Sequence, residues 1–305
     1  MTLPAERISL ATVISGTRRY VELRDRAGKI CSAIVESKAM DIVTGDEVEY
    51  ISVDANNVVK RVLTRKNCLS RCYRKTEKKI AANLDLVIIV TAVDPLFNTT
   101  FVDRLIVASS EQEIEFMMVL NKVDLGIENT KELINLYSGL KIPFILTSVL
   151  NDQGLDELVS YLQRPGIEKI ALAGISGVGK SSILNKLIPG AERETNIVSK
   201  RTGQGKQTTS QAYAYPFQKT DRQEILLIDL PGLSSFGLTH LSKESIRFYF
   251  KDFLEFQGDC QYADCLHIME PSCAVKNALA VGKIAASRYK SYTEILKEIE
   301  DAREY

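Results

Sequence analysis

The sequence predicts a multi-domain α/β protein with an N-terminal β-barrel of the OB type, a central α/β domain and a C-terminal helical domain. Short β-rich runs come first, continuous apolar runs separated by helical segments follow, and a Cys/His cluster with a charged helix comes last. We place the domain boundaries at residues 1–75, 76–240 and 241–305. With 305 residues, 45% of them hydrophobic, the chain is long enough to bury two or three separate cores.

The N-terminal part contains about five short strands separated by turns. Ser15-Gly16 and Thr44-Gly45-Asp46 are typical turn sequences, and so many strands in so short a segment favour a small OB-type barrel. By analogy of fold alone, such a barrel binds RNA or DNA more often than it catalyses a reaction. The predicted strands are Ala11–Ile14, Tyr20–Leu23, Ile30–Val35, Glu47–Ile51 and Val58–Leu63.

A strongly basic stretch follows the barrel. Between Lys60 and Lys79 nine lysines and arginines stand against the single acid Glu77, although the net charge of the whole chain is zero. The whole-chain balance therefore gives no indication of a nucleic-acid partner, but a local patch still can. The alternative is a solvated linker between two domains.

The sequence also bears on location and assembly. No apolar run approaches the roughly 20 residues needed to cross a bilayer, and Met1–Ala11 lacks a basic region followed by an apolar stretch. We therefore expect a cytoplasmic protein without a membrane partner. Nothing in the sequence indicates oligomerisation, so we expect a monomer.

The middle of the chain, residues 81–238, predicts a mainly parallel sheet, because continuous apolar runs are typical of strands covered on both faces. Helical segments such as Thr99–Ser110 and Leu155–Leu162 lie between these runs. Beyond them, helices are expected at Lys243–Phe256 and from about Tyr289 to Arg303. The predicted strands are Leu84–Val93, Phe116–Leu120, Pro143–Leu146, Ile170–Ala173 and Ile225–Ile228.

A phosphate-binding loop is predicted at Gly174–Ser181, which matches G-x-x-x-x-G-K-[ST] between a strand and a helical stretch. Backbone N–H groups of the loop would surround the phosphates. Lys180 would reach the β- and γ-phosphates, and the Ser181 hydroxyl would bind Mg²⁺. The expected nucleotide contacts are Gly174, Ser176, Gly177, Val178, Gly179, Lys180, Ser181 and Ser182, with Lys180 also a candidate catalytic residue.

A second Mg²⁺ ligand is expected at Asp229, in the turn Asp229-Leu230-Pro231-Gly232. An aspartate at this position of a P-loop protein holds Mg²⁺ through water, and Gly232 would supply a backbone N–H that senses the γ-phosphate. An Asp-x-Pro-Gly turn is weak evidence alone. Its place at a strand end, about 50 residues after the phosphate loop, makes it a candidate site.

Guanine recognition is predicted by Asn121-Lys122-Val123-Asp124 at the end of a buried strand. The Asp124 carboxylate can accept hydrogen bonds from guanine N1–H and N2–H₂, which adenine does not offer, and would select GTP over ATP. Asn121 would meet the guanine edge, and Lys122 would pack along the base. Ser148, after the next strand, belongs to a weaker partner motif whose backbone would face guanine O6.

The order of these motifs is permuted. Asn121 and Ser148 precede the phosphate loop at Gly174, whereas in most small GTPases the base-reading motifs follow Asp-x-x-Gly. Circular permutation is tolerated where the original termini lie close together at the surface. The central domain is therefore predicted to be a circularly permuted P-loop GTPase domain. The segment after Asp229, which responds to the γ-phosphate, then leads straight into the C-terminal domain.

Two further functions need residues on the switch segments. A threonine that caps Mg²⁺ in the GTP state is expected between the phosphate loop and Asp-x-Pro-Gly, and both Thr208 and Thr209 are candidates. Directly after Asp-x-Pro-Gly the chain has Leu233, which cannot polarise water, where Ras-like enzymes have Gln. His240 is therefore a candidate water-positioning and catalytic residue, with a surface or helix-capping histidine as the alternative.

Cys260, Cys265, His267 and Cys273 predict a structural zinc site in the C-terminal domain. Three thiolates and one imidazole within 14 residues match a tetrahedral Cys₃His set, and a complete set leaves no open position for catalysis. Buried, unligated cysteines are the alternative. Three of the six cysteines and one of the only two histidines fall in this short segment, which favours the metal.

Together these motifs resemble the bacterial ribosome small-subunit-dependent GTPases, the RsgA or YjeQ family. The resemblance lies in the permuted order, Gly174–Ser182, Gly203–Thr209, Asp-x-Pro-Gly followed by Phe-Gly-Leu-x-His, and Cys260–Val275, and it covers nearly the whole chain. It implies an OB domain, a permuted GTPase domain and a zinc domain that act late in 30S subunit maturation, with GTP hydrolysis stimulated by that subunit. It also implies a catalytic role for His240.

The expected function is hydrolysis of GTP to GDP and phosphate, coupled to binding and release from the 30S subunit. The OB and zinc domains would contact 16S rRNA, and the cofactors would be one structural Zn²⁺ and Mg²⁺ bound with GTP. An alternative from a different class is a GTP-responsive, zinc-containing RNA-binding scaffold with negligible turnover. The intact Lys180, Ser181, Asp229 and Asp124 argue against such a dead site.

Overall fold

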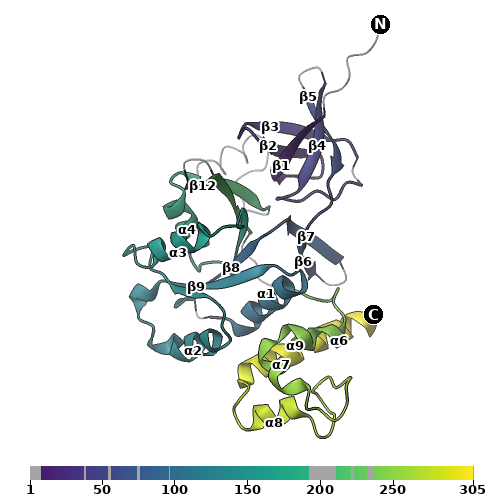
Figure 1. Ribbon diagram of the computed structural model, residues 1–305, viewed down its shortest axis with the longest axis vertical. Coiled ribbons are helices and arrows are strands. Elements are labelled where there is room, and N and C mark those ends of the chain that lie inside the picture. Colours follow the sequence, from purple (N-terminus) through teal and green to yellow (C-terminus); the bar gives the residue numbers. More distant parts are fainter. Residues whose placement is uncertain are drawn as a thin grey trace.

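The computed structural model describes residues 8–37, 39–53, 56–73, 76–95, 97–191, 211–220, 223–231 and 236–304. They form an N-terminal barrel, a central sheet with helices, and a C-terminal group of helices, which follow one another along the molecule (Figure 1). A two-stranded sheet lies between the barrel and the C-terminal helices (Figure 1). The predicted fold class is confirmed in all three parts.

The N-terminal barrel is closed, and its five strands follow the spatial order β1-β2-β3-β5-β4. Neighbouring strands pair antiparallel except β3 and β5, which are parallel. In β2, Val21 and Leu23 are buried while Tyr20 is exposed, the period of two that fills a barrel interior. The strands are β1 (Ser9–Gly16), β2 (Tyr20–Asp25), β3 (Ile30–Val35), β4 (Glu47–Val53) and β5 (Asn56–Val62).

The basic stretch folds into a β-hairpin in its second half, so the interpretation as a solvated linker is wrong there. Strands β6 (Cys68–Tyr73) and β7 (Thr76–Ala82) pair antiparallel, and β7 leads within a few residues into the central sheet. Leu69 and Ala81 have no solvent exposure, so part of the hairpin is packed against the protein. The domain boundary expected between residues 75 and 76 falls between these two strands.

Acidic side chains neutralise much of the basic stretch. Arg65 forms an ion pair with the buried Asp46 at 2.7 Å. Further ion pairs join Lys60 to Glu36, Arg61 to Glu49, Lys66 to Asp85 and Lys79 to Asp41. Arg71 and Lys78 on the hairpin have no ion-pair partner among the described residues. The local positive charge open to a partner is therefore smaller than the composition suggests.

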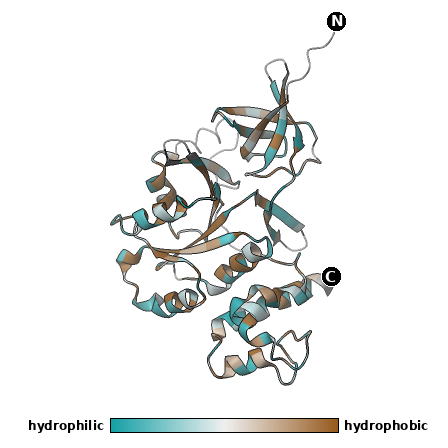
Figure 2. Cartoon of the chain, in the orientation of Figure 1, coloured by the Kyte–Doolittle hydropathy of each residue, from teal (hydrophilic) through white to brown (hydrophobic). Residues whose placement is uncertain are grey.

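The central sheet has the order β10-β9-β8-β11-β13-β12 and contains every strand predicted for it. Five strands run parallel, and the edge strand β12, which was not predicted, pairs antiparallel with β13. All seven residues of β8 are buried, and hydrophobic residues run along the strands of this sheet (Figure 2). The strands are β8 (Leu86–Ala92), β9 (Glu115–Asn121), β10 (Phe144–Leu146), β11 (Lys169–Ala173), β12 (Tyr213–Thr220) and β13 (Gln223–Asp229).

Helices return the chain from the carboxyl end of one parallel strand to the amino end of the next. The Asn98 side chain caps the first of them by accepting a hydrogen bond from Phe101 N at 3.0 Å. No helix in the described part of the chain is long and apolar enough to span a bilayer. The helices of the central part are α1 (Thr99–Glu111), α2 (Lys131–Gly139), α3 (Leu155–Leu162) and α4 (Lys180–Leu187).

The helix predicted at Lys243–Phe256 is broken, which corrects the prediction. The break lies at Phe250, whose backbone is extended with φ −94° and ψ 93°. Its buried ring lies 5.3 Å from the ring of Tyr292 and 4.5 Å from the Arg288 guanidinium. This long-range packing overrides the local helical pattern. The C-terminal elements are α6 (Lys243–Ile246), a 3₁₀ turn (Arg247–Tyr249), α7 (Lys251–Gln257), α8 (Ala274–Ala280) and α9 (Ala286–Glu304).

Arg288 on α9 ties the C-terminal helices to the central domain through buried ion pairs. Its guanidinium lies 2.5 Å from Asp103 on α1 and 2.8 Å from Asp252 on α7. Tyr137 donates a further hydrogen bond to Asp103 at 2.8 Å. Burial raises the pKa of Asp103, and the positive charge of Arg288 opposes that shift. The carboxylate is therefore stable in its buried place only with its cation.

Arg288→Ala should lower the free energy of unfolding by about 3–5 kcal/mol, because it leaves the buried Asp103 and the largely buried Asp252 without a positive charge beside them. Lys290→Ala removes only an exposed ion pair with Glu294 on the same helix. It should change the free energy of unfolding by less than about 1 kcal/mol. Chemical denaturation of the two variants makes the comparison. Similar small losses in both would contradict a structural role for the buried pairs.

Candidate functional site

The phosphate loop, Gly174–Ser181, runs from the end of β11 into α4. Gly177 and Gly179 have φ angles of 86° and 94°, which favour glycine. A Cβ atom at Gly179 would lie 2.2 Å from Asn121 Nδ2, so this position also requires glycine for space. Of the remaining predicted contacts, Ser176, Gly177, Ser181 and Ser182 are exposed, whereas Gly174 and Val178 are buried.

The Lys180 side chain is held inside this loop. Its Nζ donates hydrogen bonds to the carbonyl oxygens of Gly174 at 2.8 Å and Ile175 at 3.2 Å. Burial lowers the pKa of Lys180, and the nearby Asp229 opposes the shift. An ammonium fixed in a loop of backbone N–H groups is an arrangement suited to anionic phosphates.

Asn121 connects the base-reading motifs with the phosphate loop. Its Nδ2 donates to Val178 O at 3.0 Å, and its Oδ1 accepts a hydrogen bond from Thr147 Oγ1 at 3.2 Å. The side chain is buried, with 2% exposure. Three segments that are far apart in the sequence therefore meet at one amide group.

Asp124 and Ser148 lie side by side beyond Asn121. Ser148 Oγ donates to Asp124 Oδ1 at 2.5 Å, which fixes one carboxylate oxygen. Lys122 has a left-handed backbone, φ 61°, and its Nζ donates to Asp94 O at 2.6 Å. The structure thus brings all four predicted base-reading residues to the carboxyl ends of β9 and β10. The contact from Lys122 to Asp94 was not predicted, because no motif marks residue 94.

Asp229 ends β13 beside the phosphate loop. The backbone N–H of the next residue, Leu230, donates to Leu172 O at 3.1 Å and holds the turn against β11. Burial raises the pKa of Asp229 to about 6, and Lys180 lowers it. The Asp229 Oδ1 atom is buried and has no hydrogen-bond partner among the described residues. An orphaned buried carboxylate oxygen next to a phosphate loop fits a group that binds a hydrated cation.

Some predicted residues lie outside the described part of the chain. These are Gly232 of the Asp-x-Pro-Gly turn and the two switch candidates, Thr208 and Thr209. Their expected roles stay predictions.

His240 is exposed and lies next to the hairpin β6–β7. Its Nδ1 is 3.3 Å from the Sγ atom of Cys72, a cysteine that sequence reasoning did not single out. The two residues are 168 positions apart and share no motif. Among the described residues, no hydrogen bond links His240 to the phosphate loop or to Asp229.

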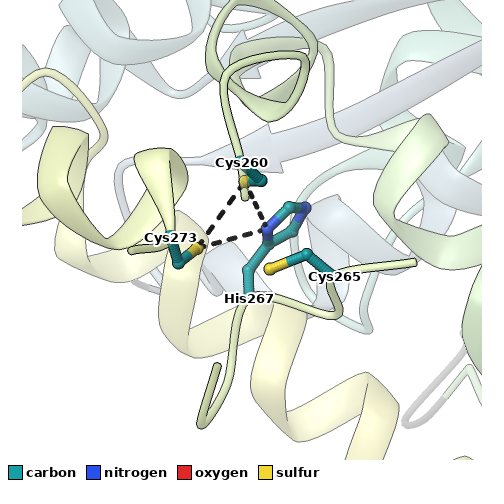
Figure 3. Close-up of side chains that lie close together, drawn as sticks. All are labelled: Cys260, Cys265, His267 and Cys273. Atoms are coloured by element: carbon teal, nitrogen blue, oxygen red, sulfur yellow. Dashed lines mark hydrogen bonds between the residues drawn. The ribbon is translucent and has the colours of Figure 1, made fainter. Parts of the chain in front are cut away.

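The Cys/His cluster is assembled as predicted, with the four side chains pointing toward one centre (Figure 3). All four ligand atoms lie within 4.8 Å of one another. Cys260 Sγ is 3.9 Å from Cys273 Sγ and 3.6 Å from His267 Nδ1. Zinc–sulfur bonds of about 2.3 Å in a tetrahedron place two sulfurs about 3.7 Å apart, so the cluster has the right size for such an ion.

Burial sets the protonation of the cluster without a cation. It raises the pKa of Cys265 to about 12 and lowers that of His267 to about 4. The imidazole is therefore neutral at physiological pH, as a metal ligand must be, while the Cys265 and Cys273 thiols, whose pKa burial raises, need a positive ion to lose their protons. His267 Nε2 is buried without a hydrogen-bond partner among the described residues, so Nδ1 is the atom that faces the thiols.

Hydrogen bonds outside the cluster hold the loop that carries it. Glu270 accepts from the backbone N–H groups of Leu266 at 2.7 Å and Ile268 at 2.8 Å. On α9, Tyr289 donates to His267 O at 2.6 Å and Tyr292 donates to Leu266 O at 2.7 Å. None of the three supporting side chains was predicted, because the two tyrosines lie on a helix whose position relative to the loop is a tertiary property.

These arrangements define a class of protein: a GTPase with a P-loop fold whose base-reading strands precede the phosphate loop along the chain. A family model described as RsgA GTPase matches residues 62–239. The chain belongs to the RsgA family of GTPases. The family suggested by the motif order is thereby confirmed.

Named relatives and solved structures cover nearly all of the chain. "Small ribosomal subunit biogenesis GTPase RsgA" of Borrelia garinii subsp. bavariensis is 34% identical over 87% of this chain and 83% of that protein. The protein of the same name from Thermotoga maritima is 36% identical over 85% of this chain and 84% of its own. The crystal structure of YjeQ from Thermotoga maritima has a TM-score of 0.74 at 33% identity, covering 96% of this chain and 99% of that one.

A fourth comparison supports the fold alone. YloQ, described as a circularly permuted GTPase, has a TM-score of 0.68 at 24% identity and covers 97% of this chain and 96% of that chain.

Proposed function

We propose that this GTPase binds the small ribosomal subunit during its assembly, hydrolyses GTP there and then leaves. The name that the relatives share, small ribosomal subunit biogenesis GTPase, supports the small subunit as the partner. The observation that carries the enzymatic part is the Asn121 amide, which holds the guanine-reading motif and the phosphate loop together at 3.0 Å. A protein that no longer used GTP would not need to keep the base-binding and phosphate-binding ends of the nucleotide site aligned.

The described contacts support a role for each of the nucleotide-binding residues. Asp124 accepts from guanine N1–H and N2–H₂ with the carboxylate that Ser148 orients. Lys122 packs along the base, and the backbone at Ser148 faces guanine O6. The backbone N–H groups of Gly174–Ser182 surround the phosphates, and Lys180 neutralises charge on the β- and γ-phosphates.

Ser181 and Asp229 would hold Mg²⁺, the first through its hydroxyl and the second through water. The ion would supply charge stabilisation on the phosphates. Gly232 and one of Thr208 and Thr209 complete the γ-phosphate contacts, and His240 positions the attacking water. In this mechanism the protein makes no covalent bond to the phosphate; it positions groups and stabilises charge.

The Cys260, Cys265, His267 and Cys273 cluster would hold one structural Zn²⁺. The donor set of three thiols and one imidazole is typical of zinc, and the spacing in the fold suits a tetrahedral ion. Filling all four positions leaves no site for a substrate, so the ion would stabilise the loop that α9 supports.

The barrel and the C-terminal domain would contact 16S rRNA, with the protein acting as a monomer. Among the described basic residues of the hairpin, Arg71 and Lys78 are the candidates for phosphate contacts, since Lys79 is already paired with Asp41.

A scaffold that binds GTP with negligible turnover is the alternative. The measurement that separates the two is GTP turnover of the full chain with and without purified 30S subunits. Stimulated multiple turnover supports the enzyme, and stoichiometric binding without phosphate release supports the scaffold.

Asp124→Asn should weaken GTP binding by at least about tenfold, because the amide no longer accepts both guanine hydrogen bonds. It should also favour xanthine nucleotides, whose donor and acceptor pattern matches the amide. Asp156→Asn, an exposed acid on α3, serves as the matched control. Competition titrations with GTP and XTP test this, and unchanged GTP affinity in Asp124→Asn would exclude the assignment.

A further inference from the structure

The segment Phe236–His240, which begins seven residues after Asp229, is held by the central and C-terminal helices. Arg104 on α1 donates to Phe236 O at 3.2 Å. Glu298 on α9 accepts from Leu238 N at 3.3 Å and forms an ion pair with the same Arg104. One carboxylate therefore joins a helix of the GTPase fold, the C-terminal helix and the backbone that follows the Asp-x-Pro-Gly turn.

Cys72 on β6 holds the same segment from a third direction. Its backbone N–H donates to Gly237 O at 2.9 Å, and its Sγ lies 3.3 Å from His240 Nδ1. A thiol can either donate to an imidazole nitrogen or accept from it, so one of the two tautomers of His240 always suits the contact. The Cys72 side chain is buried, with 7% exposure, which gives it little freedom to turn away.

Gly237 shows how closely these elements approach the segment. A Cβ atom there would lie 2.5 Å from Cys72 O and 2.8 Å from Glu298 Oε1. The strand and the C-terminal helix thus leave space for glycine only. We call Cys72, Arg104 and Glu298 the clamp.

The clamp holds His240 against the hairpin β6–β7, which enters the central sheet at the end opposite the nucleotide motifs. Asn121 and Asp229 are the last residues of β9 and β13, and Gly174 directly follows β11, so all three lie at the carboxyl ends of parallel strands. The hairpin β6–β7 instead leads into the amino end of β8, and Cys68 N donates to Gln112 Oε1, just after the end of α1, at 2.8 Å. Figure 1 shows the hairpin at one end of β8 and α4 beyond the other.

We propose that Cys72 and Glu298 are positioning residues that keep His240 in a resting place, so that GTP turnover without a partner is slow. The inference rests on the proposed water-positioning role of His240. Hydrolysis then requires the segment Phe236–His240 to leave the clamp. A partner that binds the hairpin or α9 can weaken the clamp contacts. The fraction of molecules with His240 free sets the unstimulated rate.

Cys72→Ala should raise GTP turnover in the absence of ribosomal subunits by about 3- to 10-fold, the factor that one net hydrogen bond contributes to an equilibrium. The backbone contact to Gly237 stays, so the segment is loosened only at His240. Cys72→Ser keeps a group able to bond with the imidazole and should stay within about twofold of the wild type. A merely structural loss lowers activity and cannot produce this gain.

Glu298→Ala should give a gain of similar size through a different contact, because it frees Leu238 N and Arg104 together. Glu294→Ala, one turn earlier on α9, touches Thr100 and Lys290 but no residue of the segment, and should leave turnover unchanged. Thermal unfolding and GTP titration of each full-length variant check that folding and nucleotide affinity are intact. If Glu298→Ala does not fold, Glu298→Gln replaces it: its amide oxygen still accepts from Leu238 N, so only the ion pair with Arg104 is lost and a smaller gain in turnover is expected.

The double variant Cys72→Ala/His240→Ala should lose the gain, because no imidazole remains to be released. Wild-type or lower turnover in both folded clamp variants would overturn the clamp. If His240→Ala abolishes subunit-stimulated hydrolysis in the same experiment, only the clamp has failed. If His240→Ala leaves the stimulated rate unchanged, the proposed role of His240 fails and the clamp falls with it.

Discussion

His240→Ala should leave the binding of GTP and of the small subunit near wild-type levels while lowering subunit-stimulated hydrolysis by about 10²- to 10⁴-fold. Directly after Asp-x-Pro-Gly the chain has Leu233 in place of a glutamine, so the attacking water needs another side chain to orient it. Because release is proposed to follow hydrolysis, the variant should also stay on the particle. Phosphate release and sedimentation with 30S subunits measure the two effects.

Lys243→Ala is the matched control for this experiment. Lys243 lies three residues further on and makes only an exposed ion pair with Glu300. Its loss should leave stimulated turnover within about twofold of the wild type. The same small change in His240→Ala would assign His240 to structure, and would point to an rRNA group or another switch residue as the source of stimulation.

Cys265→Ala should remove one metal ion per chain and unfold the C-terminal loop, because structural zinc contributes about 10–16 kcal/mol of apparent binding free energy in zinc-finger peptides. The affinity for GTP should change much less, since no described contact of the cluster reaches the phosphate loop or the base-reading residues. Metal analysis and limited proteolysis of the C-terminal domain measure the loss.

Cys31→Ala in the barrel is the control, because Cys31 is a partly exposed free cysteine far from the cluster in sequence. It should keep the metal and the protease resistance of the wild type. A metal-free preparation of the natural chain with a fully folded C-terminal domain would exclude the zinc assignment.

Local patterns were sufficient for most of the fold. The five barrel strands and the five predicted strands of the central sheet lie within a few residues of their expected places, because a buried strand reveals itself by its own apolar residues. The two strands of the hairpin β6–β7 were not predicted in this way. The hairpin β6–β7 is rich in lysine and arginine, and its packing depends on distant residues: Lys79 pairs with Asp41, and Leu69 and Ala81 are buried.

The break at Phe250 and the contact of His240 with Cys72 have the same explanation. Nothing near Phe250 interrupts the helical pattern; a ring from α9 and the Arg288 guanidinium decide the backbone there. Cys72 likewise lies in a stretch notable only for its charge. The candidate site differs in this respect. Its phosphate loop, base-reading motif and cysteine cluster could all be recognised in the sequence, since that chemistry demands fixed residue types at fixed spacing.

The hydrogen bond from Asn121 to Val178 has a consequence for how GTP is captured. It joins residues 57 positions apart and is made by the protein's own groups, so the fold itself aligns the loops that meet the base and the phosphates. Such preorganisation reduces the ordering entropy that binding has to overcome. The contact does not depend on the order in which the chain forms these parts, because it needs only the end of β9 and the loop after β11 within hydrogen-bond distance.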